Sequence, residues 1–112
     1  MKLVESTADG VTVVEVSGRI DSTTAGALSE RLVALVGSGR KRLVVDLNRI
    51  AYISSAGFRS LLIANRAAKD NRGVLGLCGV QGEVKRLFET GAFTDLFLIC
   101  ATRADAIAKL QQ

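Results

Sequence analysis

The stretch RLVVDLNRIAYISSAGFRSLL, residues 42–62, decides the fold because its hydrophobic pattern changes in the middle. Residues 43–47 form a short apolar run rich in valine, which predicts a central strand covered on both faces. After two serines, an alanine and a glycine, residues 54–57, the pattern takes the spacing of an amphipathic helix: Phe58, Leu61, Leu62 and Asn65. A strand that runs directly into a helix is the building unit of an α/β sheet.

The same alternation continues on both sides of this stretch. The sequence predicts these strands: residues 1–7, 11–17, 43–47, 74–78 and 96–99, the first two joined by the hairpin signal Asp9-Gly10. Apolar stripes predict these helices: residues 28–36, 58–68, 84–88 and 104–110. This order predicts one α/β domain over residues 1–112. Its mixed, mostly parallel β-sheet should have about five strands packed by about four helices.

The residue types exclude several kinds of catalytic or metal site. The chain contains no histidine, which is the commonest general base and transition-metal ligand. Cys78 and Cys100 fit no zinc or redox spacing, so we interpret them as buried thiols that pack as small hydrophobic side chains. No metal and no cofactor is therefore expected.

Charge and hydropathy limit the partners. The net charge is +4, but aromatic residues make up only 4% of the chain, too few for a base-stacking platform, so no nucleic-acid partner is expected. No apolar run approaches the roughly 18 residues of a membrane span, so no membrane insertion is expected. Glu5 and Asp9 stand where a signal peptide needs an apolar core, and a cytoplasmic protein is therefore expected.

Two enzymatic or nucleotide-binding readings of the chain have little support. Residues 53–57 lack the first glycine of the G-x-S-x-G nucleophile motif, and no histidine exists to accept a serine proton. Gly76, Gly79 and Gly82 are spaced G-x-x-G-x-x-G, which is not a dinucleotide fingerprint, so they are interpreted as a tight turn.

Two other roles suit serines at the N-terminus of a helix. Ser54 or Ser55 could cap the helix, which contributes about 1 kcal/mol. Either could also accept a phosphate, which adds about −1.5 to −2 charge where the helix dipole tolerates it. The small residues Ala56 and Gly57 would leave backbone N–H groups uncovered and let another surface come close.

Three motifs make the chain resemble a STAS domain of the bacterial anti-sigma factor antagonist family, over essentially its whole length. They are Gly18-Arg19-Ile20-Asp21, the run LVVDL followed by IAYISSAGFRSLL, and VKRLFETGAF at residues 84–93. The central pattern of the family reads Asp-Ser-Ser-Gly-Leu. When that pattern is aligned on Gly57, the phosphorylated serine of the family falls on Ser55, its second serine on Ala56 and its aspartate on Ser54.

The resemblance implies a regulatory binding module and not an enzyme. Ser55, or as a second choice Ser54, would be the reversible phosphorylation site. The partners would be an anti-sigma factor that is also a serine kinase, and a serine phosphatase. The unphosphorylated protein, expected to be a monomer, would bind the kinase and so release a sigma factor. The expected docking surface comprises Asp21, Ser22, Thr23, Thr24, Tyr52, Ile53, Ser54, Ser55, Ala56, Gly57, Phe58 and Arg59. Phe58 is either a core residue or an apolar anchor for the partner.

Two alternatives remain open at this point. STAS-like domains also serve as accessory subunits of ABC-type lipid-transport systems, where they bind the ATPase and need no phosphorylation. The second alternative is a ligand-sensing STAS module that uses a cleft at the strand ends.

Overall fold

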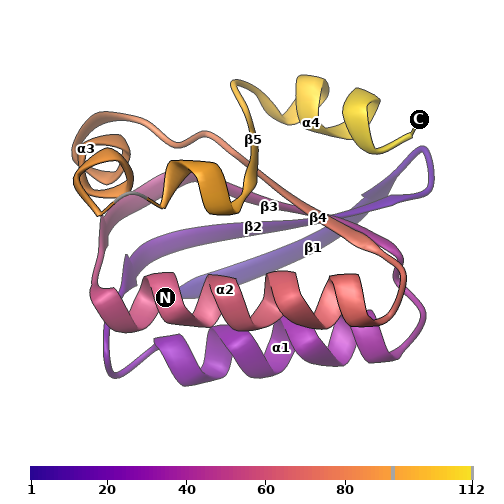
Figure 1. The fold of residues 1–112 in the computed structure, drawn as a ribbon, viewed down its shortest axis with the longest axis horizontal. Helices are drawn as coiled ribbons and strands as arrows, with labels where there is room; N and C mark the ends of the chain where they lie inside the picture. Colours follow the sequence, from indigo (N-terminus) through magenta and orange to yellow (C-terminus); the bar gives the residue numbers. More distant parts are fainter. Residues whose placement is uncertain (92, 112) are drawn as a thin grey trace.

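The computed structural model describes residues 1–91 and 93–111, and its strands form one mixed sheet. The strand order follows the sequence: β1 (Lys2–Ala8), β2 (Val11–Ile20), β3 (Arg42–Ile53), β4 (Val74–Cys78) and β5 (Leu98–Cys100). β1 is antiparallel to β2, and all other neighbours are parallel (Figure 1). The predicted mixed, mostly parallel sheet is therefore confirmed.

The hairpin between β1 and β2 forms where the sequence predicts it. Asp9 and Gly10 both have positive φ, 53° and 80°. Two successive residues of this kind make the turn whose twist matches that of the flanking strands.

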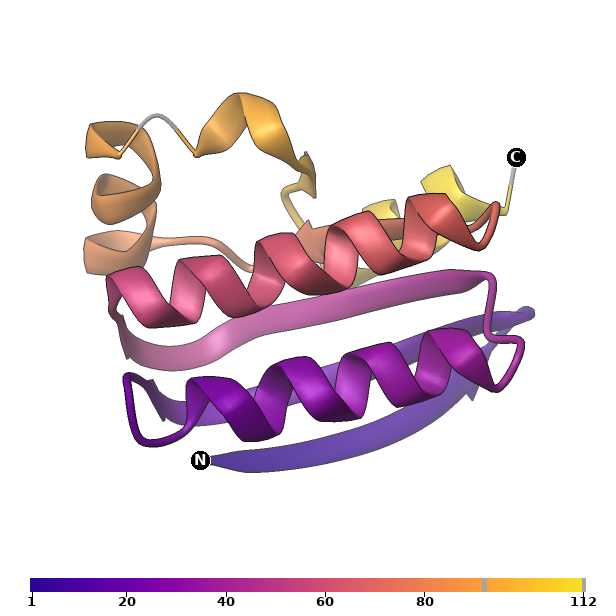
Figure 2. The ribbon, with the colours of Figure 1, turned by 60° about the horizontal axis from the view of Figure 1, so that its bottom comes forward.

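The helices lie on both faces of the sheet. α1 (Ala25–Gly37) and α2 (Ser55–Asp70) run side by side across one face, and α4 (Arg103–Leu110) lies on the other (Figures 1 and 2). α3 (Gly82–Thr90) packs at the end of the sheet where β3 finishes. None of the helices in the described part of the chain is long and apolar enough to cross a membrane.

The alternation of β3 divides the core between the two faces. Leu43, Val45 and Leu47 point into a large apolar cluster beneath α1 and α2, whereas Val44 joins a smaller cluster beneath α4. Every residue from 43 to 47 is buried, which confirms the prediction of a strand covered on both faces.

The last strand differs from its prediction. The run LFLI predicts a strand over residues 96–99, but Leu96 ends a short 3-10 helix, η1 (Thr94–Leu96), and β5 begins at Leu98. Phe97 is buried, with its ring 6.0 Å from that of Phe88, so the run is apolar because it reaches an aromatic cluster before it enters the sheet. Four apolar residues without a period cannot separate these two environments.

The two cysteines occupy matched positions on neighbouring strands. Cys78 and Cys100 are register partners on β4 and β5, and both are free thiols. Cys78 is fully buried as expected, but Cys100 is only half-buried, because β5 lies at the edge of the sheet.

Candidate functional site

The candidate site lies where β2 and β3 end together. Ile20 and Ile53 are register partners at the ends of these strands, so the residues that follow them emerge at the same edge of the sheet. The backbone N–H of Ser54 donates to the carbonyl of Ile20 at 2.8 Å, which ties the two exits together. The structure therefore brings the loop at Asp21 and the start of α2 to one place.

The two serines at the start of α2 have different surroundings. Ser54 precedes the helix in an extended conformation, and its hydroxyl accepts a hydrogen bond from the N–H of Gly57 at 3.3 Å. It is therefore the N-cap of α2. Ser55 is the first helical residue and is exposed, and its hydroxyl makes no hydrogen bond to any described residue.

Gly57 lets the first turn of α2 approach the strand ends closely. A Cβ atom at this position would lie 2.6 Å from Cγ1 of Ile53 and 2.8 Å from Cγ2 of Ile20. The missing side chain at Gly57 thus serves packing within the chain. The sequence suggested that a small residue here would let another surface come close, but Gly57 itself is buried and leaves no such room.

The loop after β2 is held by hydrogen bonds around Asp21. Its carboxylate oxygen Oδ1 accepts from the N–H of Thr23 at 2.9 Å and from the Thr23 hydroxyl at 2.6 Å. The hydroxyl of Thr24 donates to the carbonyl of Arg19 at 3.0 Å instead of capping α1. The bonds from Thr23, with a smaller contribution from Arg19, hold the pKa of Asp21 below its usual value. Asp21 is therefore a fixed negative charge at neutral pH.

Arg19 and Tyr52 add a contact that sequence reasoning missed. The guanidinium of Arg19 lies over the Tyr52 ring, 4.5 Å from its centroid, and its Nε is 3.8 Å from Oδ2 of Asp21. Arg19 and Tyr52 are register partners on β2 and β3, a relation that only the strand pairing reveals. The pair connects the Asp21 loop to the end of β3.

An open depression of about 440 Å³ borders Ser55. Its lining is Ser55, Ala56, Arg59, Leu62 and Phe93. The ring of Phe93 stacks on that of Phe58, with 4.3 Å between the centroids. Phe58 itself is only 4% exposed, which identifies it as a core residue.

The predicted docking surface therefore divides into two groups. Ile53, Gly57 and Phe58 are buried and offer no side chain to a partner in this structure. The remaining members are exposed or half-buried at the same edge of the sheet: Asp21, Ser22, Thr23, Thr24, Tyr52, Ser54, Ser55, Ala56 and Arg59.

An ionic cluster on the opposite face was not predicted. Arg103 at the start of α4 donates from Nε to Oδ2 of Asp46 at 2.8 Å and from Nη2 to Oε2 of Glu15 at 2.6 Å. Asp46 is 5% exposed, and its charge is compensated by this arginine and by the N–H of Asn48. Burial, followed by the Asp46 charge, raises the pKa of the neighbouring Cys78 thiol to about 12. These contacts fasten α4 to the sheet, away from Ser55.

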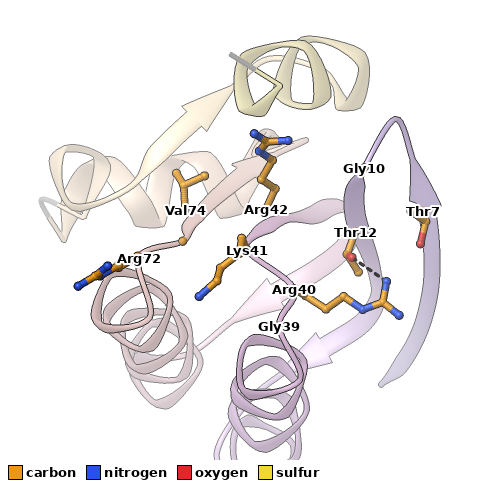
Figure 3. A pocket seen from close by; sticks show the side chains of 10 residues that line it. Thr7, Gly10, Thr12, Gly39, Arg40, Lys41, Arg42, Arg72 and Val74 are labelled. Carbon is orange, nitrogen blue, oxygen red and sulfur yellow. Dashed lines mark hydrogen bonds between the residues drawn. The ribbon is translucent and has the colours of Figure 1, made fainter.

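The basic run at residues 40–42 lies at the other end of the sheet, beside an open depression of about 660 Å³ (Figure 3). Its cations diverge: Arg40 donates to the Thr12 hydroxyl at 3.5 Å, and Lys41 donates to the carbonyl of Asn71 after α2. A cation on the carbonyls beyond a helix C-terminus is a stabilising arrangement. We therefore assign Lys41 a structural role.

Comparison with known proteins identifies the family of this chain. The STAS domain model matches residues 3–106, and the chain belongs to the STAS domain family. The chain is 35% identical over 108 residues to BtrV of Bordetella bronchiseptica, a protein named as an anti-sigma factor antagonist, and the match covers 96% of this chain and 93% of the relative. It is 28% identical over 96 residues to the anti-sigma-B factor antagonist of Staphylococcus aureus, covering 86% of this chain and 89% of that protein.

A solved structure agrees with this assignment. The crystal structure of an anti-sigma factor antagonist from Mycobacterium paratuberculosis superimposes with a TM-score of 0.85 at 26% sequence identity. The match covers 99% of this chain and 94% of that chain. The expected STAS fold is thus confirmed.

Proposed function

We propose that this protein is a phosphorylation-controlled anti-sigma factor antagonist of the cytoplasm. In its unphosphorylated form it binds an anti-sigma factor that is also a serine kinase, and the sigma factor is released. The kinase transfers phosphate to Ser55 and ends the interaction, and a serine phosphatase restores it. The proposal assigns the chain a binding role and no catalytic one. The names of the relatives support the antagonist class.

The observation that carries the proposal is the division of roles between the two serines. The hydroxyl of Ser54 is occupied by the cap bond to Gly57, whereas Ser55 presents an exposed hydroxyl without a partner among the described residues. A kinase can therefore modify Ser55 without breaking a hydrogen bond that holds the fold.

The position of Ser55 also explains how the fold would survive the modification. The first residue of a helix lies among backbone N–H groups that have no partner within the helix, and the helix dipole favours negative charge there. A phosphate adds about −1.5 to −2 charge at that point. We therefore expect phosphorylation to leave α2 intact and to change only the surface that the partner meets.

Repulsion is the proposed signal to the partner. Asp21 already places a fixed negative charge on the neighbouring loop. A phosphate on Ser55 raises the negative charge of the same edge of the sheet. A partner that faces this edge with carboxylates would then meet further negative charge, and like charges brought together at an interface cost several kcal/mol, so the partner would dissociate.

The test is to phosphorylate this protein in vitro with the purified anti-sigma factor kinase from the same organism. With kinase and ATP, the parent and Ser54→Ala should gain about 80 Da, one phosphate, and Ser55→Ala should gain nothing. Ser55→Asp should bind the kinase more weakly than the parent. A Ser55→Asp variant that binds as tightly as the parent would overturn the switch. Co-purification with a transport ATPase, without phosphorylation, would favour the accessory-subunit alternative.

A further inference from the structure

One line of side chains runs along the outer surface of α2, and we call it the α2 ridge: Ser55, Arg59, Leu62, Arg66 and Lys69. The spacing of four and three residues places all five on one narrow stripe of a helix. The opposite side of α2 is buried against the sheet, so the ridge faces outward. At 1.5 Å per residue the ridge is about 21 Å long.

The ridge carries three cations that form no salt bridge with a described carboxylate. Arg59, Arg66 and Lys69 are exposed, and none of them lies within salt-bridge distance of a described carboxylate. On the neighbouring helix α1, by contrast, Arg31 is paired with Glu5 of β1. The positive charge of this helix layer is therefore concentrated along α2.

The middle of the ridge is apolar. Leu62 lies between the cations and lines the depression beside Ser55, together with Ala56 and Phe93. An apolar centre with a charged rim is the arrangement found in protein–protein interfaces. Binding to a nucleic acid would instead need more cations or stacking aromatic side chains along the path.

We propose that the α2 ridge is a docking surface for an acidic protein surface, one that offers an apolar side chain to the depression and carboxylates to the three cations. This inference rests on the proposed function, because the protein bearing that surface is the partner kinase. It extends the docking surface from the strand ends along the whole of α2. Ser55 stands at one end of the ridge, so a phosphate there would oppose the acidic surface directly.

Lys69 and Lys109 give a matched pair of variants for the test. Both are exposed lysines in the last turn of a helix, Lys69 on α2 and Lys109 on α4, and they lie on opposite faces of the sheet. Lys69→Glu and Lys109→Glu change the net charge and the helix dipole equally. Only Lys69→Glu alters the ridge, and Arg66→Glu provides a second ridge variant.

The measurement is the association rate constant and the Kd of each variant with the purified kinase, at low and at high salt. Charges at an interface act mainly on the association rate and are screened by salt. Lys69→Glu and Arg66→Glu should each associate about threefold more slowly than Lys109→Glu at low salt, with the difference shrinking at high salt. Equal thermal unfolding of the variants would show that the folds are intact.

The possible results separate this inference from the proposed function. Equal rates for Lys69→Glu and Lys109→Glu, together with weaker binding by Ser55→Asp, would overturn the ridge and leave the switch standing. Undiminished binding by Ser55→Asp, with slow association of the ridge variants, would overturn the switch and support the ridge as a docking surface. Ridge variants that lose binding to duplex DNA while kinase binding is unchanged would also overturn the inference.

Discussion

Replacement of Gly57 by alanine tests the packing that positions Ser55. The new Cβ would lie 2.6 Å from Cγ1 of Ile53, 2.8 Å from Cγ2 of Ile20 and 3.0 Å from the Ile20 carbonyl oxygen. Carbon atoms in contact are normally about 3.5–4.0 Å apart, so the groups must separate by roughly 1 Å. The Ile20 carbonyl also accepts the bond from the N–H of Ser54, and a shift of α2 would strain that bond.

The magnitude follows from two opposing terms. Overpacking a close-packed core costs about 1–3 kcal/mol. Alanine favours the helix over glycine by about 1 kcal/mol. Because Ile20 and Ile53 are both almost completely buried and have little room to move, the overpacking cost should lie in the upper part of its range, at about 2–3 kcal/mol. The free energy of unfolding of Gly57→Ala should therefore fall by about 1–2 kcal/mol. With a urea m-value of about 2 kcal/mol/M, the midpoint should fall by roughly 0.5–1 M.

Gly26 provides the control for this prediction. It is the second residue of α1, and a Cβ atom there would meet nothing within 4 Å. Gly26→Ala should therefore raise the free energy of unfolding, by up to about 1 kcal/mol. Urea unfolding followed by circular dichroism measures both variants. The same sign of change in the two variants would refute the packing argument.

Three further predictions concern single groups. Ser54→Ala should lower the free energy of unfolding by about 0.5–1 kcal/mol through loss of the cap, whereas Ser55→Ala should change it by less than about 0.5 kcal/mol, as urea unfolding would show. The pKa of Asp21 is lowered in the folded protein, so its contribution to stability is present above its unfolded pKa of about 4 and is lost as the pH falls through the folded value. The urea midpoints of the parent and Asp21→Asn should accordingly converge below about pH 4, and a constant gap would contradict this. Cys78, with a pKa of about 12, should resist iodoacetamide at pH 8 until the protein unfolds, while the half-buried Cys100 reacts first. Peptide mass mapping measures the order of modification, and earlier modification of Cys78 would contradict this prediction.

Local patterns explain why most of the fold could be predicted from the sequence. The valine-rich run at 43–47 and the apolar stripe that follows Gly57 differ in period, and period separates strand from helix. The hairpin at Asp9-Gly10 required only a turn signal. The prediction of β5 was wrong at its start because the run LFLI has no period that separates strand from helix. Leu96 ends the 3-10 helix, and Phe97 packs in the aromatic cluster instead of entering the sheet.

Contacts between distant residues explain what the sequence could not show. Arg103 lies 57 positions from Asp46 and 88 positions from Glu15, so no spacing rule connects them. The stacking of Arg19 on Tyr52 depends on strand register in the same way. Within the candidate site, the family pattern pointed to Ser55, but only the hydrogen bond from Gly57 shows that Ser54 performs the capping.

The attachment of α4 to the far face of the sheet has a practical consequence. Arg103 and a small apolar cluster hold this helix on the side opposite α1 and α2, and the last described residues lie beyond it at the end of the molecule farthest from the start of α2 (Figure 1). A fluorophore or surface tether attached near residue 111 would therefore leave the Ser55 edge unobstructed. Attachment at this end would allow single-molecule and surface-based binding measurements without changing the proposed docking surface.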